Sequence, residues 1–327
     1  MPYSAEVIRY ARAELARQKE DRETLQRRRL QEAYTKLPRL KEIDDQIRRT
    51  MAQAAQAVFV KGGDGAAAME QVKQDNLSLQ QERKSLVEAH FAPGWLDETP
   101  ICDRCGGTGY LGSSMCRCLH KLCAGEQRRT LRRLCTGNER FENFRLDYYS
   151  DRIDPDFGAS HRQIMERTFA RCRQYAESFR LGAPNLLFNG GTGLGKTFLS
   201  ACIAEVLTDK GYSVVYESAP QLFAKLEKNR FNPTEQTRAD VESYVNCDLL
   251  IIDDLGTEMP GNFVTAALYA LLNDRLLDNK SMLISTNLIA EELPERYSGQ
   301  IASRLQGNFK VLTFVGEDVR IQKNRGF

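Results

Sequence analysis

The residues whose types and spacing point most directly to chemistry form a glycine-rich stretch near the middle of the chain, Gly190–Thr197. It matches the pattern Gly-x-x-x-x-Gly-Lys-Thr of a Walker A phosphate-binding loop. The apolar run Leu186–Phe188 before it predicts a buried strand, and Phe198–Leu207 after it predicts a helix. Because a strand, the loop and a helix in this order are the context that the motif requires, we expect a nucleoside triphosphate to bind here.

Each residue type in the loop has a physical purpose. Glycines let successive backbone N–H groups point at phosphate oxygens, and the N-terminus of the following helix adds positive potential. Lys196 is expected to reach the β- and γ-phosphates, and the Thr197 hydroxyl to ligate Mg²⁺. The residues expected to contact the nucleotide are Gly190, Gly191, Thr192, Gly193, Leu194, Gly195, Lys196, Thr197 and Phe198.

Two adjacent carboxylates follow a second apolar run. Leu249–Ile252 predicts a buried strand, and Asp253 and Asp254 come directly after it, which is the Walker B arrangement. We expect Asp253 to hold Mg²⁺, mostly through water, and to contribute to the nucleotide site. Asp254 is expected to orient or polarise the attacking water.

Three further polar residues complete the predicted catalytic set of Lys196, Asp254, Asn287, Arg304 and Arg320. Asn287 ends a predicted strand that begins at Met282, and it is expected to hydrogen-bond the γ-phosphate or the water. This pattern implies a strand inserted between the Walker A and Walker B strands. Arg304 lies on a predicted helix and Arg320 lies just after a predicted strand, 311–314. Either arginine can stabilise transition-state charge, one within the chain and one on a neighbour's site.

Four cysteines lie close together in the sequence, as the pairs Cys102 and Cys105, and Cys116 and Cys118. Two such pairs across a glycine-rich loop are typical of a structural Zn²⁺ site, with free or redox-active thiols as the alternative. His120 and Cys123 are spare ligand candidates. The basic helix expected next, with arginines at 128, 129, 132 and 133, either meets phosphates or an acidic partner, or is merely solvated.

The first part of the chain is rich in charged, helix-forming residues. Pro38 is expected to break an apolar stripe that runs from Leu30 to Met51, and 61–65 is expected to form a hinge before a second helix, 66–90. Two amphipathic helices joined in this way predict a helical hairpin or a coiled-coil pairing. Such a hairpin serves either as a docking arm for another protein or only for packing and dimerisation.

Composition places limits on the whole chain. Its 327 residues are more than one domain usually needs, and we expect three regions, 1–99, 100–140 and 141–327. The net charge of +2 favours no class of partner by itself. No apolar run is long enough for a membrane span and no signal-peptide core is present, so a cytoplasmic protein without a membrane partner is expected.

Several stretches of the sequence resemble the AAA+ helicase-loader family of the DnaC and DnaI type. They are Gly190–Leu199, Asp248–Glu258, Ser285–Asn287 and Ile301–Asn308, together with the aromatic lead-in Phe141–Tyr149. The cysteine-rich stretch resembles the zinc-bearing N-terminal part of the DnaI-like loaders. The likeness covers residues 100–327 well and 1–99 only in general character.

This resemblance implies an α/β fold: an AAA+ P-loop ATPase core with a five-stranded parallel sheet, following an N-terminal helical and zinc-binding region. It implies that Asn287 is sensor 1, that Arg304 is an arginine finger reaching the ATP of an adjacent subunit, and that Arg320 is sensor 2. Because only seven residues follow Arg320, the lid is expected to be absent or minimal.

The resemblance also implies a function. The family binds the replicative hexameric helicase through its N-terminal region, here residues 1–140, places it on single-stranded DNA, and self-associates through the AAA+ domain with ATP, Mg²⁺ and Zn²⁺ as cofactors. An IstB-type transposition helper ATPase and a nucleotide-switched adaptor without meaningful hydrolysis are the alternatives. From the residues alone, Lys225, Lys228 and Arg230 either contact DNA phosphates, with Phe223 or Phe231 stacking on bases, or form a solvated helix face.

Overall fold

The computed structural model describes residues 3–59, 65–134 and 138–324 of the chain. The chain divides into two compact units. One unit is Leu15–Thr108, and the other combines Met1–Glu14 with Gly109–Phe327. The division into regions 1–99, 100–140 and 141–327 remains a prediction.

The unit Leu15–Thr108 is built from helices α1 (Ala5–Lys36, whose first residues belong to the other unit), α2 (Pro38–Phe59) and α3 (Gly65–His90). Pro38 is the first residue of α2, which confirms the predicted break, because proline fits the first turn of a helix but not its interior. Residues 61–64 of the predicted hinge lie outside the described residues.

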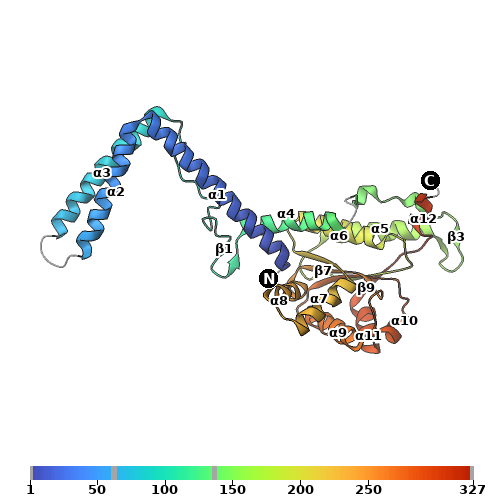
Figure 1. Cartoon of the computed structure of the whole chain (residues 1–327). Coiled ribbons are helices and arrows are strands. Elements are labelled where there is room, and N and C mark those ends of the chain that lie inside the picture. The colour runs from blue at the N-terminus through green and yellow to red at the C-terminus, as the bar shows by residue number, and fades with distance from the viewer. Residues whose placement is uncertain (1–2, 60–64, 135–137, 325–327) are drawn as a thin grey trace. The chain divides into compact units, whose positions relative to one another are not determined.

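Helices α2 and α3 lie along each other as a hairpin (Figure 1). Arg39 Nε lies 2.8 Å from Glu82 Oε1, and Arg83 Nε lies 2.7 Å from Asp44 Oδ1. The Ile43 side chain is fully buried. Apolar burial and the ion pairs between the helices therefore hold the hairpin together.

The other unit contains a five-stranded parallel sheet, as expected. Its strands are β5 (Asn185–Asn189), β6 (Val214–Ser218), β7 (Leu249–Leu255), β8 (Ser281–Thr286) and β9 (Phe309–Thr313). They are arranged in the order β6-β7-β8-β5-β9, and every neighbouring pair is parallel. Strand β8 lies between β5 and β7, which confirms the predicted insertion between the Walker A and Walker B strands.

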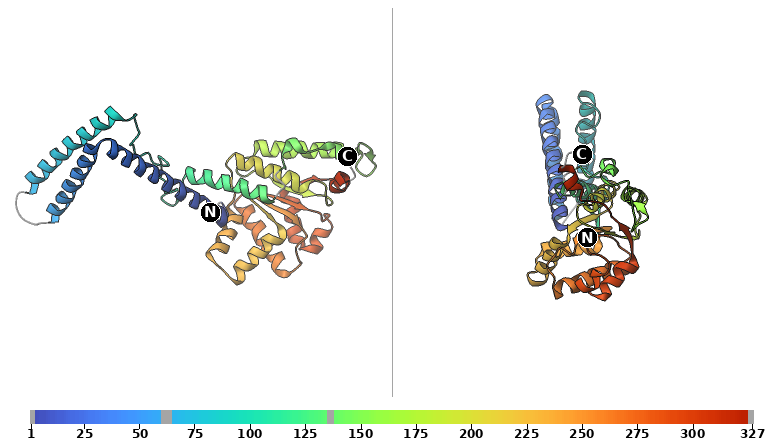
Figure 2. Two further views of the ribbon diagram at one scale, coloured as in Figure 1. Left: turned by 45° about the horizontal axis from the view of Figure 1, so that its top comes forward. Right: turned by 90° about the vertical axis from the view of Figure 1, so that its right-hand side faces the viewer.

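Helices cover both faces of this sheet (Figures 1 and 2). On one face α5 (His161–Ser178) and α6 (Lys196–Asp209) bury Met165, Leu199 and Ile203 against the sheet, and α4 (Arg117–Leu134) packs against α6. The other face is covered by α7 (Ala219–Phe231), α8 (Glu235–Asn246), α9 (Asn262–Leu277), α10 (Glu292–Arg296) and α11 (Gly299–Asn308). The short helix α12 (Val319–Asn324) follows β9.

Short elements complete this unit. The strands β1 (Tyr110–Leu111) and β2 (Ser114–Met115) form one antiparallel pair, and β3 (Ile153–Asp154) and β4 (Ala159–Ser160) form another. The 3₁₀ turns η1 (Phe141–Asn143) and η2 (Leu146–Tyr148) precede the second pair.

The first residues of the chain pack within the same unit as the sheet. Tyr3, Val7 and Ala11 are buried, and the Tyr3 ring meets the His120 ring of α4 edge-on with centroids 5.6 Å apart. The beginning of α1 is therefore part of this unit's core. In the described part of the chain, none of the helices combines the length and the apolar character needed to cross a bilayer.

Candidate functional site

The predicted phosphate-binding loop connects β5 to α6, as its motif requires. Glycine is obligatory at two of its positions for different steric reasons. At Gly190 (φ +153°) a Cβ would collide with the Phe314 carbonyl oxygen beyond β9, and at Gly193 (φ +72°) it would collide with the Asp318 carboxylate. The loop is therefore packed against the end of β9 and the start of α12, and the Val319 N–H donates to the Gly193 carbonyl at 3.0 Å.

Lys196 is the first residue of α6 and is only 5% exposed. Its Nζ donates to the carbonyl oxygens of Gly190 and Gly191, both at 2.6 Å. Burial lowers the pKa of Lys196, whereas the nearby carboxylates of Asp254 and Asp253 act in the opposite direction. The ammonium group is thus held inside the loop and close to the Walker B residues.

The Walker B carboxylates are positioned by groups from the neighbouring strands. Asp253 accepts hydrogen bonds from the Tyr216 hydroxyl of β6 (2.8 Å) and from the Ser285 hydroxyl of β8. Ser285 Oγ also accepts the Asp254 N–H at 2.9 Å, and Asp254 has a φ of +55°, in the left-handed region. One serine therefore fixes both acidic residues.

Asp254 differs from Asp253 in its surroundings. Asp253 is 5% exposed, whereas part of the Asp254 side chain is open to solvent. Partial burial raises the pKa of the Asp254 carboxyl, the neighbouring Asp253 raises it further, and Lys196 and Arg320 act in the opposite direction. A carboxylate with a raised pKa at the edge of a cavity suits the handling of a water proton.

A cavity of about 410 Å³ brings much of the predicted site together. Its walls combine the phosphate loop, Asp254, the C-terminal Arg320 and an aromatic lead-in. The lining residues are Asn138, Glu139, Asn143, Phe144, Arg145, Tyr148, Tyr149, Thr192, Gly193, Leu194, Gly195, Lys196, Thr197, Phe198, Asp254, Val319 and Arg320. Phe144, Tyr148 and Tyr149 of the aromatic lead-in thus line the same cavity as the phosphate loop.

The aromatic wall is built locally. The Phe144 ring stacks on Phe169 at a centroid distance of 5.2 Å and lies 5.7 Å from Phe198 of α6. The Tyr149 hydroxyl donates to the Leu194 carbonyl at 3.0 Å, and burial raises the pKa of Tyr149. These contacts connect the lead-in to the loop.

Two residues of the predicted catalytic set, Asn287 and Arg304, are not among those that line this cavity. Asn287 directly follows β8 and is exposed. Arg304 lies on α11, where its Nη2 donates to the Tyr269 hydroxyl and its Nε to Asn273 Oδ1, both at 2.8 Å.

The donor set fits a nucleoside triphosphate with Mg²⁺. Oxygen ligands are what Mg²⁺ prefers, and the Thr197 hydroxyl and the Asp253 carboxylate would supply them. The bound ion would neutralise charge that develops on the phosphates. The loop glycines and the buried Lys196 provide the complementary positive surface.

The four predicted zinc ligands lie together. Cys102, Cys105, Cys116 and Cys118 place their sulfur atoms within 4.8 Å of one another, and two of the thiols are buried. Gly106, Gly107 and Gly109 have positive φ angles in the turns between them. This is compatible with tetrahedral Zn²⁺ coordination.

The spare candidates do not belong to this cluster. The His120 ring pairs with the Tyr3 hydroxyl at 3.3 Å, and Cys123 is fully buried in α4, where burial raises the pKa of its thiol to about 12.

The structure corrects part of the predicted DNA contact. Phe223 is 4% exposed and packs in the core, so it cannot stack on a base. Lys225 is held by Glu217 at 2.5 Å. Phe231 is 68% exposed, and the Arg230 guanidinium lies over its ring. Of the residues predicted to contact DNA, Phe223 thus faces the core, and the others are exposed to solvent.

The sequence is similar to a protein family and to several known proteins. The family of IstB-like ATP binding proteins matches residues 126–325. The replicative helicase loader DnaC of Escherichia coli (strain K12) is 23% identical over 137 residues, which is 42% of this chain and 56% of that protein. The insertion sequence IS232 putative ATP-binding protein of Bacillus thuringiensis subsp. berliner is 26% identical over 143 residues, with the same coverage. The chain thus spans little more than half the length of these relatives.

Among solved structures, the crystal structure of the DnaC helicase loader aligns with a TM-score of 0.43 and 20% identity, covering 54% of this chain and 98% of that one. The family match covers more than half of the sequence and includes the phosphate loop and the paired carboxylates. The chain therefore belongs to the family of IstB-like ATP-binding proteins, with a P-loop ATPase fold.

Proposed function

We propose that this protein is an ATP-dependent loader that places a replicative hexameric DNA helicase on single-stranded DNA. The observation that carries the proposal is the combination, on one chain, of the nucleotide cavity with a helical hairpin and a four-cysteine cluster that precede the family match. The similarity to the DnaC loaders over the ATPase region supports it.

The chain's own groups would act in a simple sequence. The loop and Lys196 would bind the phosphates, Asp253 and Thr197 would hold Mg²⁺, and Asp254 would orient the attacking water. Arg304 of one subunit would complete the site of another, so ATP turnover depends on assembly. Asn287 and Arg320 would contact the γ-phosphate in this scheme.

The test is co-purification of the host replicative helicase with the full chain and with a chain that lacks the hairpin, residues 38–90. Residues 1–14 are retained because Tyr3 and Val7 belong to the core of the sheet unit. We expect the full chain to bind and the shortened chain to fail, while both keep ATP affinity. Failure of the full chain to bind contradicts the proposal.

The second candidate is a transposition helper, favoured by the similarity to insertion-sequence ATP-binding proteins at 26% and 28% identity. It predicts binding to duplex DNA and to a transposase instead of the helicase.

A third possibility, a nucleotide-switched adaptor, differs from the other two candidate functions because it does not need ATP hydrolysis. For an adaptor, Asp254→Asn leaves partner binding and cellular function intact. For a loader that requires turnover, the same variant binds ATP and the helicase but does not complete loading.

A further inference from the structure

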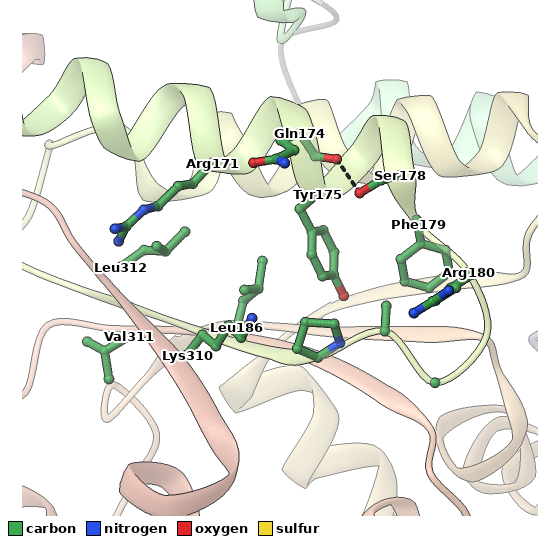
Figure 3. A pocket seen from close by; sticks show the side chains of 13 residues that line it. Arg171, Gln174, Tyr175, Ser178, Phe179, Arg180, Leu186, Lys310, Val311 and Leu312 are labelled. Carbon is green, nitrogen blue, oxygen red and sulfur yellow. Dashed lines mark hydrogen bonds between the residues drawn. The ribbon is translucent and has the colours of Figure 1, made fainter.

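A second cavity lies at the other end of the parallel strands, away from the phosphate loop. It has a volume of about 750 Å³, and its walls are the second half of α5, the segment before β5 and the first part of β9 (Figure 3). We call it the edge groove, defined by Arg171, Gln174, Tyr175, Ser178, Phe179, Arg180, Gly182, Ala183, Pro184, Leu186, Lys310, Val311 and Leu312. None of these residues lines the nucleotide cavity.

The charge of the edge groove has a single sign. Arg171, Arg180 and Lys310 line it, and no aspartate or glutamate does. All three are exposed, and no ion pair involves any of them in the described part of the chain. The groove therefore favours an anionic ligand.

The charges are spread along the groove. Arg171 and Arg180 lie at its opposite ends in Figure 3. Arg171 lies seven residues before the last residue of α5, Ser178, which is roughly 10 Å of helix at 1.5 Å per residue, and Arg180 follows the end of the helix. An extended anionic ligand can therefore pair with both arginines along the length of the groove.

One wall of the groove is an open sheet edge. Among the described residues, strand β9 pairs with β5 alone, at the end of the sheet. The Phe314 N–H donates to the Asn189 carbonyl at 2.7 Å. Because the main-chain groups of successive residues alternate along a strand, the N–H and C=O groups of residues 310 and 312 also point toward β5, and those of Val311 point away from the sheet. The Thr168 hydroxyl donates to the outward Thr313 carbonyl at 3.0 Å, which agrees with this alternation.

The floor of the groove is apolar and closed. Leu186 and Leu312 are 4% exposed, and the Tyr175 and Phe179 rings are 9% and 6% exposed. Buried rings cannot stack on nucleotide bases, which single-stranded nucleic acids use for much of their affinity. An open edge with main-chain hydrogen-bonding groups instead matches the way an extended peptide adds to a sheet.

We propose that the edge groove binds an extended acidic segment of a partner protein, which pairs with β9 at Val311 and places carboxylates beside Lys310, Arg171 and Arg180. This is a second docking site, beyond the proposed loading function and separate from the nucleotide cavity. A lysine on an edge strand also discourages edge-to-edge pairing with another sheet. The test must therefore distinguish a lysine that binds an acidic ligand from one that only prevents aggregation.

The probe is a short fluorescein-labelled peptide that alternates glutamate with valine, mixed with the full chain and followed by anisotropy. A peptide with lysine in place of glutamate and an oligothymidylate serve as competitors. The variants are Lys310→Glu and Arg171→Glu, and the matched control is Arg167→Glu, an exposed arginine of α5 outside the groove. ATP affinity reports whether each variant is folded.

We expect the acidic peptide to bind, each groove variant to weaken it by about tenfold, and the control to leave it within about twofold. Added salt should weaken binding, and the Val311 amide should gain protection from hydrogen exchange in the complex. All variants should retain ATP affinity, whatever the outcome of the helicase test.

Three results overturn the proposal. One is the absence of peptide binding at low salt. Another is binding that the groove variants leave unchanged. The third is evidence of a different occupant: competition by the oligothymidylate would assign the groove to nucleic-acid phosphates, and a change only in self-association would assign it to a second copy of this chain.

Discussion

At the scale of single residues, Ser285 decides how the acidic pair is presented. Its hydroxyl donates to the Asp253 carboxylate and accepts the Asp254 N–H, and Asp254 has the left-handed backbone of a residue held in an uncommon conformation. A hydrogen bond to a charged group contributes more than a neutral one, because its loss leaves a buried charge undersolvated.

For Ser285→Ala we expect the Mg²⁺ concentration for half-maximal ATP hydrolysis to rise several-fold, and the free energy of unfolding to fall by about 1–3 kcal/mol. The matched control is Ser200→Ala, which removes a buried hydroxyl that has no hydrogen-bond partner in the described part of the chain. Magnesium titrations of hydrolysis and urea unfolding measure the two effects. If both variants changed the Mg²⁺ dependence and the free energy of unfolding equally, Ser285 would not position the acidic pair.

Residues that belong to sequence motifs were predictable from sequence, and residues that support them from other strands were not. Gly190–Thr197 and Asp253 are local patterns in which composition and spacing reveal the chemistry. Tyr216 and Ser285 reach Asp253 only because β6 and β8 flank β7, which depends on strand order. Arg275 of α9 belongs to no sequence motif, yet it is fully buried and donates to backbone carbonyls.

At the scale of elements, helix α8 and the start of α1 meet around Asp240. Burial is the largest cause that raises the pKa of this carboxyl; Lys225 acts in the opposite direction, as does a hydrogen bond with the backbone of Ala5. A raised folded-state pKa means that the charged form costs stability, so this contribution is favourable below the ordinary value of 3.8 and is lost as the pH rises through the folded value.

Asp240→Asn should therefore raise the free energy of unfolding at neutral pH, and the gain should disappear once Asp240 is protonated in both states. Urea unfolding at neutral pH and near pH 3 checks this. Asp278→Asn, which removes an aspartate after α9, is the control. A gain that persists unchanged in acid would show that charge is not its cause.

The loop that carries the four cysteines is expected to depend on a bound zinc ion for its folded conformation. We expect one zinc per chain in the purified protein, its loss in Cys105→Ser, and its retention in Cys123→Ala, since Cys123 lies outside the cluster. Metal analysis after gel filtration measures the stoichiometry, and a fall in the thermal unfolding temperature should accompany its loss. Metal-free wild-type protein would contradict the zinc assignment.

The same scale shows the limits of pattern reading. Pro38 and the helices on either side of it were predictable because proline and apolar spacing act locally. The orientation of α7 was not, because its stripe alone does not say that Phe223 faces the core while Phe231 faces solvent. Tertiary packing makes that choice.

At the scale of the whole molecule, ATP turnover is proposed to need more than one chain, since Arg304 is absent from the lining of its own cavity. Arg304→Ala should bind ATP normally but lose the hydrolysis that appears at high protein concentration, by about a hundredfold or more.

A mixing experiment separates this from damage to the fold. Asp254→Asn chains have an intact Arg304, and Arg304→Ala chains have an intact Asp254, so mixing the two inactive variants should restore part of the hydrolysis. Steady-state phosphate release over a range of mixing ratios measures it. No recovery at any ratio would mean that Arg304 does not act across an interface.

Strand β9 joins two distant places within the sheet unit. Its first residues line the edge groove, and the chain just past its end meets the phosphate loop, where the Phe314 N–H donates to Asn189 and its carbonyl leaves no space for a Cβ at Gly190. If a peptide ordering one end of this strand changes the affinity for ATP by some factor, thermodynamic reciprocity requires ATP to change the affinity for the peptide by the same factor. A five-residue strand would then let the energy of nucleotide binding select when a partner is held.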